Sequence, residues 1–117
     1  MSAAAVVERM EPFVRTLRRA HPETPIVMAE DRLYSNDTII PGPRKHNAEN
    51  HAALKSAYDH LLAGGIKGLH YLPGAIQLGD DGEGTVDGSH PTDLGFLRMA
   101  DAFAPVLAEA LRQASEK

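Results

Sequence analysis

The chain has 117 residues and a formal net charge of −4, and 43% of its residues are hydrophobic. These values are typical of one soluble globular domain, or part of one, and they exclude disordered and collagen-like chains. There is no cysteine, which excludes disulfides, thiolate catalysis and thiolate zinc sites. The negative charge gives no general attraction to nucleic acid. No apolar run approaches the roughly 20 residues that span a bilayer.

The first residues do not form a secretory signal. Acidic residues arrive early, at Glu8 and Glu11, and no basic segment precedes an apolar stretch. The compartment therefore stays open, with the cytoplasm as the default. The one basic cluster, Arg15, Arg18 and Arg19, lies at the end of a predicted helix. Cations there complement the helix dipole, so the cluster is interpreted as a helix end rather than a phosphate-binding patch.

The first half of the chain predicts one helix and one strand. Apolar residues at helical spacing predict an amphipathic helix over Ala3 to Ala20. Pro12 lies inside this pattern, so the helix is expected to begin nearer Glu11 or to bend at the proline. The apolar run Ile26–Ala29 predicts a short strand buried on both faces. A polar loop is expected to follow, from Glu30 through Pro43.

The second half repeats the alternation of helix and strand. Apolar spacing predicts a helix over Ala48 to Ala63, which the two following glycines end. A second short strand is expected at Leu69–Leu72. The last helix should begin near Thr92, whose hydroxyl can cap backbone amides, and it carries a long apolar face. Pro105 lies inside that helix and should bend or interrupt it.

The order helix, strand, helix, strand, helix predicts α/β architecture with parallel strands. A parallel sheet normally contains more than two strands, and helices cover both of its faces. Residues 1–117 are therefore expected to form the C-terminal part of a larger α/β domain. The edges of so small a sheet would be exposed, which favours pairing with another chain, including a second copy of this one.

A carboxylate and a histidine lie three residues apart in the segment before the last helix. Asp87 can reach one ring nitrogen of His90, fix its tautomer and leave the other nitrogen free as a base. The alternative is a structural turn, in which Asp87 accepts hydrogen bonds from loop amides. On the residues alone, the structural interpretation is the more common case, because many such ion pairs have no catalytic role.

This segment resembles the last signature block of the SGNH (GDSL-type) hydrolases, in which a D-x-x-H-P motif supplies the catalytic aspartate and histidine. The likeness extends over Pro12 to Leu111. The residues that carry it are Pro25-Ile26-Val27-Met28, Glu30-Asp31-Arg32, Tyr34, Gly79-Asp80-Asp81-Gly82-Glu83-Gly84-Thr85-Val86, Asp87-Gly88-Ser89-His90-Pro91 and Thr92-Asp93-Leu94-Gly95. The resemblance implies a flavodoxin-like three-layer fold and a small-molecule ester as substrate.

By this resemblance, His90 would be the general base that activates a serine, and Asp87 would orient it. The reaction would be hydrolysis of a carboxylic ester through an acyl-enzyme intermediate. The family's nucleophile lies in a G-D-S-like block near the start of its domain, and no such block occurs here. The N-terminal portion with the nucleophile and the oxyanion donors is therefore expected to be absent from residues 1–117, and the isolated chain is expected to be inactive.

Other serines of the chain are poor substitutes for that nucleophile. Ser89 adjoins His90, but successive side chains diverge, and no pair of oxyanion donors is evident nearby. Ser35 lies in the polar loop, where only the fold decides whether it approaches His90. Asn36 follows Ser35 in a Y-S-N-D sequence that lacks the family's glycine, so it is not assigned an oxyanion role.

No cofactor or metal site is predicted. The histidines show neither H-x-x-x-H on a helix face nor H-E-x-x-H; they are His21, His46, His51, His60, His70 and His90. The carboxylates between Asp80 and Asp87 lack the spacing of a calcium loop. A second hypothesis is a non-catalytic α/β binding or interaction module, which the missing nucleophile and the exposed sheet edges favour. A stable dimer or a defined partner complex would support this second hypothesis.

Overall fold

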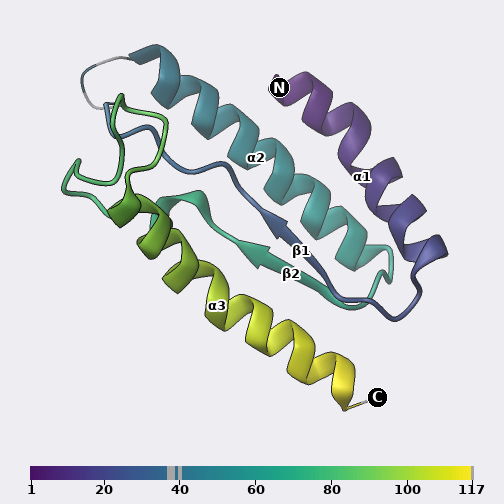
Figure 1. Ribbon diagram of the computed structural model, residues 1–117. Helices are drawn as coiled ribbons and strands as arrows, with labels where there is room; N and C mark the ends of the chain where they lie inside the picture. The colour runs from purple at the N-terminus through teal and green to yellow at the C-terminus, as the bar shows by residue number, and fades with distance from the viewer. Residues whose placement is uncertain (37–38, 40, 117) are drawn as a thin grey trace.

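The computed structural model describes residues 1–36, 39 and 41–116. Its helices and strands follow the order that the sequence predicts (Figure 1). In chain order they are α1 (Ala3–Ala20), β1 (Ile26–Ala29), α2 (Pro41–Ala63), β2 (Leu69–Leu72), the short 3-10 helix η1 (Gly74–Ile76) and α3 (Asp93–Ser115). The sequence analysis did not predict η1.

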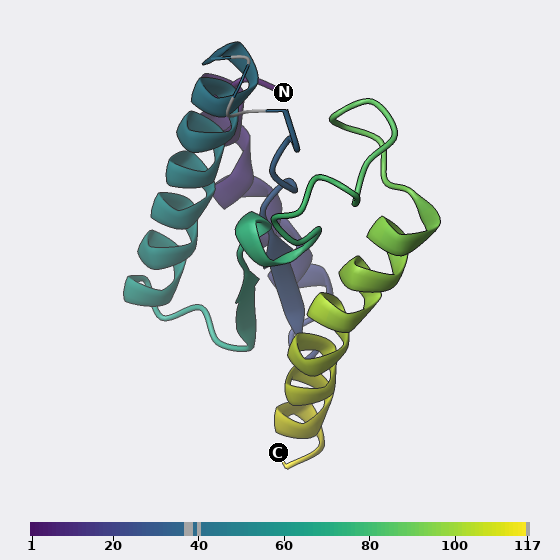
Figure 2. The ribbon, with the colours of Figure 1, turned by 90° about the vertical axis from the view of Figure 1, so that its left-hand side faces the viewer.

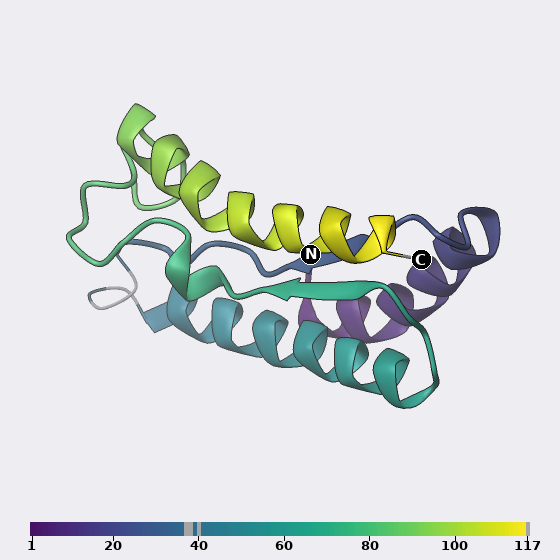
Figure 3. The same cartoon turned by 90° about the horizontal axis from the view of Figure 1, so that it is seen from below.

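The two strands form a parallel sheet, with Ile26 opposite Leu69 and Ala29 opposite Leu72. The sheet lies between α2 and α3 in Figure 2, and Figure 3 shows α1 and α2 together on one face and α3 on the other. The fold is therefore a three-layer α/β arrangement, and the predicted fold class is confirmed. Loops at the carboxyl ends of both strands gather at one end of the sheet (Figure 1).

The hydrophobic core lies between α1, α2 and one face of the sheet. Leu61 of α2 is completely buried, and Val14 of α1 is 1% exposed. Met28 of β1 and Leu69 of β2 join the same cluster, because alternate side chains of a strand point to the same face. Complete burial of a leucine such as Leu61 contributes about 2 kcal/mol, so this cluster anchors the sheet to the two helices.

The prediction for the start of the second helix was wrong. The helix begins at Pro41 rather than at Ala48. The Pro-Gly-Pro sequence there indicated a loop, but a proline in the first helical turn breaks no intrahelical hydrogen bond. The first amides of a helix have no carbonyl partner in any case. The polar loop after β1 is correspondingly shorter than predicted.

Neither internal proline ends its helix. α1 begins at Ala3 rather than near Glu11, and it continues through Pro12 to Ala20. The hydroxyl of Ser2 caps this helix by accepting a hydrogen bond from the backbone N–H of Ala5 at 3.3 Å. α3 likewise continues through Pro105. Packing and capping outweigh the local cost of a proline in both helices.

α3 begins where the sequence predicts, but much of its apolar face is not covered. The hydroxyl of Thr92 accepts a hydrogen bond from the N–H of Gly95 at 3.0 Å, which confirms the predicted cap. The buried residues of α3 are Gly95 and Ala110. Five large apolar side chains of this helix are exposed: Leu94, Phe96, Leu97, Leu107 and Leu111. Among the described helices, none is long and apolar enough to cross a membrane.

In the described residues, neither outer edge of this two-stranded sheet is paired with a further strand. Within the described ranges, β1 is hydrogen-bonded to β2 alone. Its other edge therefore presents backbone groups that a further strand could pair with. The exposed edge that the sequence predicts is present, on the strand that leads into the candidate site.

Candidate active site

The structure brings Asp87 and His90 into direct contact. Nδ1 of His90 lies 2.7 Å from Oδ2 of Asp87. The other carboxylate oxygen, Oδ1, accepts hydrogen bonds from the backbone N–H groups of Ser89 at 3.0 Å and His90 at 2.8 Å. One carboxylate therefore organises both the backbone of the turn and the histidine ring. Both sequence interpretations of Asp87, as a turn acceptor and as a partner of the ring, describe contacts that occur together.

The backbone between the two residues makes this contact possible. Gly88 has a φ of +90°, a conformation that L side chains rarely adopt, and an added Cβ would lie 2.4 Å from Nδ2 of Asn36. The N–H of Val86 donates to the carbonyl of His90 at 2.9 Å and closes the turn. The positive φ therefore favours glycine at position 88, and a larger residue there would also require the side chain of Asn36 to move.

The geometry assigns the ionisation of Asp87 and the tautomer of His90. The backbone N–H of His90, the ring of His90 and the backbone N–H of Ser89 together lower the pKa of Asp87 well below its usual range. An ionised carboxylate only accepts hydrogen bonds, so Nδ1 of His90 carries the hydrogen of this contact. In the neutral ring Nε2 is then free to accept a proton. The ring is also accessible, because 74% of the His90 side chain is exposed.

A prediction follows for the pH dependence of stability. A carboxylate whose native pKa is depressed stabilises the fold above its unfolded pKa, near 4, and this contribution is lost as the pH falls through the native pKa. Asp87→Asn should therefore destabilise the chain at pH 7, and the difference from wild type should shrink below about pH 4. Urea unfolding at several pH values measures this difference. Asp101→Asn corrects for the lost negative charge. A difference that persists unchanged to about pH 2 would contradict the assignment.

Loops from both strands hold the Asp87–His90 turn. After β1, the guanidinium of Arg32 donates to the carbonyl oxygen of Ser89 at 2.6 Å and to its hydroxyl at 2.9 Å. The N–H of Ser35 donates to the carbonyl of Gly88 at 3.0 Å. The turn itself belongs to the connection between β2 and α3. The pair thus lies at the carboxyl end of the parallel strands, where open α/β sheets bind ligands.

A carboxylate network that the sequence analysis missed fixes the start of these loops. Oε1 of Glu30 accepts a hydrogen bond from the hydroxyl of Tyr71 at 2.6 Å, and Oε2 accepts one from the N–H of Gly74 at 2.6 Å. Nδ1 of His51 lies 3.3 Å from Oε2. Burial, followed by the hydrogen bond to Glu30, raises the pKa of Tyr71 well above its usual range. The network joins β1, α2, β2 and η1 below the site.

The glycine- and aspartate-rich loop before the turn is tied to α3. Arg98 donates to both carboxylate oxygens of Asp81, at 2.6 Å and 2.5 Å, and to the carbonyl of Leu78 at 2.8 Å. The side-chain hydrogen bonds from Arg98 lower the pKa of Asp81 well below its usual range. Arg98 therefore fixes the loop from the helix side, as Arg32 fixes the turn from the strand side.

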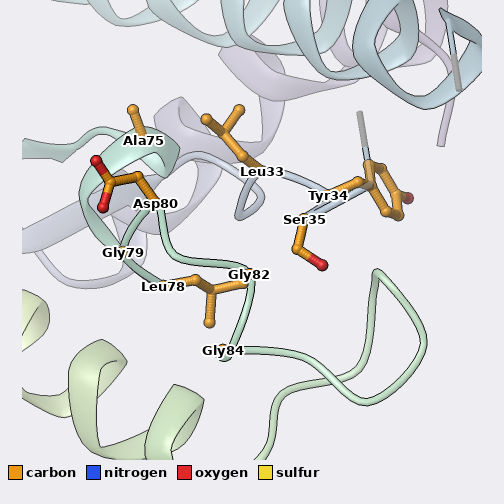
Figure 4. A pocket seen from close by; sticks show the side chains of 9 residues that line it. All are labelled: Leu33, Tyr34, Ser35, Ala75, Leu78, Gly79, Asp80, Gly82 and Gly84. Atoms are coloured by element: carbon orange, nitrogen blue, oxygen red, sulfur yellow. The ribbon is translucent and has the colours of Figure 1, made fainter. Parts of the chain in front are cut away.

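A small pocket of about 220 Å³ borders the turn (Figure 4). Leu33 and Ser35, after β1, form one side. Leu78 and the loop that follows it form the other side, with three glycine backbones at positions 79, 82 and 84. Ser35 connects the pocket to the candidate pair, because its N–H is bonded to Gly88. The lining combines apolar side chains, such as Leu33 and Leu78, with polar ones, Ser35 and Asp80.

The serines considered as nucleophiles are engaged elsewhere. The hydroxyl of Ser35 is hydrogen-bonded to the hydroxyl of Thr85 at 2.5 Å, and that of Ser89 accepts from Arg32. Among the residues that the structure describes, no serine hydroxyl is hydrogen-bonded to the ring of His90. In the same ranges, no three histidine or acidic side chains are grouped in a way that could hold a metal ion. The chain thus presents a histidine ring in contact with a carboxylate, and no described serine hydroxyl is bonded to that ring.

Comparison with known proteins places this arrangement in a family. The model of the GDSL-like Lipase/Acylhydrolase family matches residues 1–108. No curated protein matches the chain. A crystal structure described as a GDSL-like lipase from Bacteroides ovatus superposes with a TM-score of 0.89 and 32% sequence identity, over 95% of this chain and 33% of that one.

A second solved structure supports the fold. The salicylyl-acyltransferase SsfX3 from a tetracycline biosynthetic pathway superposes with a TM-score of 0.71 and 21% identity, over 92% of this chain and 32% of that one. The chain thus spans about a third of the length of each of these two structures. The resemblance inferred from the D-x-x-H-P segment is confirmed: the chain belongs to the GDSL-like lipase/acylhydrolase family.

Proposed function

We propose that this chain supplies the general base, His90, and its orienting carboxylate, Asp87, to an enzyme that hydrolyses carboxylic esters. The observation that carries the proposal is the 2.7 Å contact between Nδ1 of His90 and an ionised Asp87, with the opposite ring nitrogen left free. A fixed tautomer and an accessible Nε2 are what general-base activation of a serine requires.

The proposed reaction has two acyl-transfer steps. A serine oxygen attacks the ester carbonyl while Nε2 of His90 takes the serine proton, and the imidazolium is stabilised by Asp87. As the carbon–oxygen bond breaks, His90 returns that proton to the leaving alcohol, and an acyl-enzyme remains. His90 then takes a proton from water, which attacks the acyl carbon, and His90 returns this proton to the serine oxygen as the acyl–serine bond breaks, so that the acid and the free serine are released. If an alcohol attacked the acyl carbon in place of water, the acyl group would be transferred to that alcohol and the product would be a new ester.

We place the nucleophile and the oxyanion donors outside these 117 residues. Two observations support this: the hydroxyls of Ser35 and Ser89 are bonded to Thr85 and Arg32, and the chain spans 33% of the Bacteroides ovatus structure. The free edge of β1 and the exposed apolar side chains of α3 offer a surface for the segment that carries the serine. The substrate proposed is a small-molecule ester, in keeping with the small pocket beside the turn.

A chimera tests this proposal. In the Bacteroides ovatus protein, the segment that aligns with this chain is replaced by residues of this chain. The chimera is expected to hydrolyse p-nitrophenyl acetate about 10³-fold or more faster than the isolated chain, which has a base but no nucleophile. Turnover of this ester, followed by release of nitrophenolate, measures both. An inactive but folded chimera would count against the proposal.

Two other experimental outcomes would support a different nucleophile or a different function. If the isolated chain turns over and His90→Ala abolishes that activity, a serine of this chain is the nucleophile, and Ser35→Ala identifies the first candidate. The second candidate function, a non-catalytic module that associates through the open edge of β1, is favoured by that edge alone. A stable dimer in light scattering, together with a folded and inactive chimera, would support it.

A further inference from the structure

Arg32 makes the contacts that fix Ser89 between the two candidate catalytic residues. Nε of Arg32 donates to the carbonyl oxygen of Ser89 at 2.6 Å, and Nη2 donates to its hydroxyl at 2.9 Å. The two residues are 57 positions apart, so these contacts join the loop after β1 to the turn before α3. A guanidinium has its donors in one rigid plane, so two such contacts constrain the direction of the turn as well as its distance.

A contact that holds Ser89 in place constrains both Asp87 and His90. Its N–H donates to Asp87, and its carbonyl belongs to the peptide unit whose N–H, that of His90, donates to the same carboxylate oxygen. A displacement of Ser89 therefore changes both backbone contacts of Asp87 and the position from which the His90 ring leaves the chain. The other described hydrogen bonds of the turn reach Gly88 and the carbonyl of His90, so Arg32 makes the side-chain contacts to Ser89 itself, while 52% of the Asp87 side chain and 74% of the His90 side chain are exposed.

Arg32 is itself held by two further residues, Asp31 and Asn47. Its Nη1 donates to Oδ1 of Asp31 at 2.7 Å. Its carbonyl oxygen accepts a hydrogen bond from Nδ2 of Asn47 at 3.2 Å, and Oδ1 of Asn47 accepts one from the N–H of Tyr34. Asn47 is 1% exposed, so this anchor belongs to the interior of α2. The guanidinium is thus a fixed support rather than a free surface cation.

We propose that Arg32 is a positioning residue, which through Ser89 holds the His90 ring on Asp87 and aims Nε2 at the reacting serine. The inference rests on the proposed function of His90 for its role in turnover. The placement of the ring on Asp87 is a property of this chain alone. Arg32 touches neither the ring nor the reacting atoms, and it acts through the geometry of the turn.

Nuclear magnetic resonance of the isolated chain tests the placement. Long-range ¹H–¹⁵N correlation distinguishes the two neutral tautomers of His90, and the wild-type ring is expected in the Nδ1–H form. In Arg32→Gln the ring is expected to populate both tautomers, because the turn no longer holds it on Asp87. Arg98→Gln is the matched control: it removes an arginine that ties the preceding loop, without contact to residues 87–90. A fixed tautomer in Arg32→Gln, or equal mixing in Arg98→Gln, would overturn the proposal.

Kinetics of the chimera test the effect on turnover. Arg32→Gln should lower kcat about 10- to 100-fold with KM changed less than about twofold, because misplacement of the base affects the transition state rather than substrate binding. Arg32→Lys keeps the charge but replaces the rigid planar donors with one ammonium group, so an intermediate kcat is expected. If Arg32→Gln fails to fold, Arg32→Lys decides by the same two measurements.

Wild-type kcat in Arg32→Lys would show that charge alone suffices, and it would overturn the proposal. A loss of activity that appears as a higher KM, with kcat unchanged, would also overturn the proposal. The tautomer measurement needs no serine, so failure of this inference is distinguishable from failure of the proposed ester hydrolysis.

Discussion

His90→Ala in the active chimera is expected to lower kcat for ester hydrolysis by about 10³-fold or more. Alanine removes the group that takes the serine proton, and no other described base is placed on Asp87. The pocket and any oxyanion donors of the chimera are left unchanged, so the loss should appear in kcat rather than in KM. Steady-state kinetics with p-nitrophenyl acetate measure both constants.

The control for this substitution is His60→Ala. His60 is also an exposed histidine beside a carboxylate, with Nδ1 3.2 Å from Oε1 of Glu11 and 68% of its side chain exposed. It lies in α2 near the end opposite the candidate site, so its loss should leave kcat within about twofold of wild type. Equal activity of His90→Ala and wild type, in a chimera shown to be folded, would exclude His90 as the base.

Local patterns predicted the contacts that lie close in sequence. A spacing of three residues placed Asp87 within reach of His90, and the structure confirms the contact, whereas the catalytic role of both residues stays a proposal. Thr92 was predicted as a helix cap from its residue type and position, and it makes the capping hydrogen bond. Such features depend on a few neighbouring residues, so periodicity and turn chemistry are sufficient to find them.

Contacts between distant residues were not predicted, because no local pattern records them. Glu30 meets Tyr71 and Gly74, which are 41 and 44 positions away. Arg32 meets Ser89 across 57 positions. Each of these pairs depends on the parallel alignment of two strands, which brings their carboxyl ends to the same edge. The sequence predicted that alignment, but it did not predict which side chains of the loops would contact each other.

The apolar face of α3 shows a different limit. Helical spacing predicted the stripe correctly, but it made no statement about whether the stripe is covered, as apolar faces of helices usually are. In the structure Leu97 is 59% exposed and Leu111 is 63% exposed. Periodicity reports which face is apolar and not what covers it. The exposed leucines of α3 and the unpaired edge of β1 are both compatible with the proposal that another segment completes the site.

The support beneath the site should be sensitive to one added methyl group. Gly74→Ala is expected to destabilise the chain by about 3 kcal/mol, or to lower its Tm by roughly 10 °C. An added Cβ would lie 2.0 Å from the carbonyl oxygen of Asp31 and 2.8 Å from Cε1 of His51. The nearer atom belongs to the backbone, so no side-chain rotation relieves the clash, and η1 must move away from β1.

That movement also breaks the hydrogen bond from the N–H of Gly74 to Glu30, whose side chain is only 12% exposed. A largely buried carboxylate that loses a partner adds to the cost of the clash. Gly42→Ala is the matched control, because no atom of the described part of the chain lies within 4 Å of its added Cβ and alanine favours the helix in which Gly42 lies. Urea and thermal unfolding compare the two variants. A loss below about 1 kcal/mol for Gly74→Ala would show that η1 is not held against the segment after β1 as described.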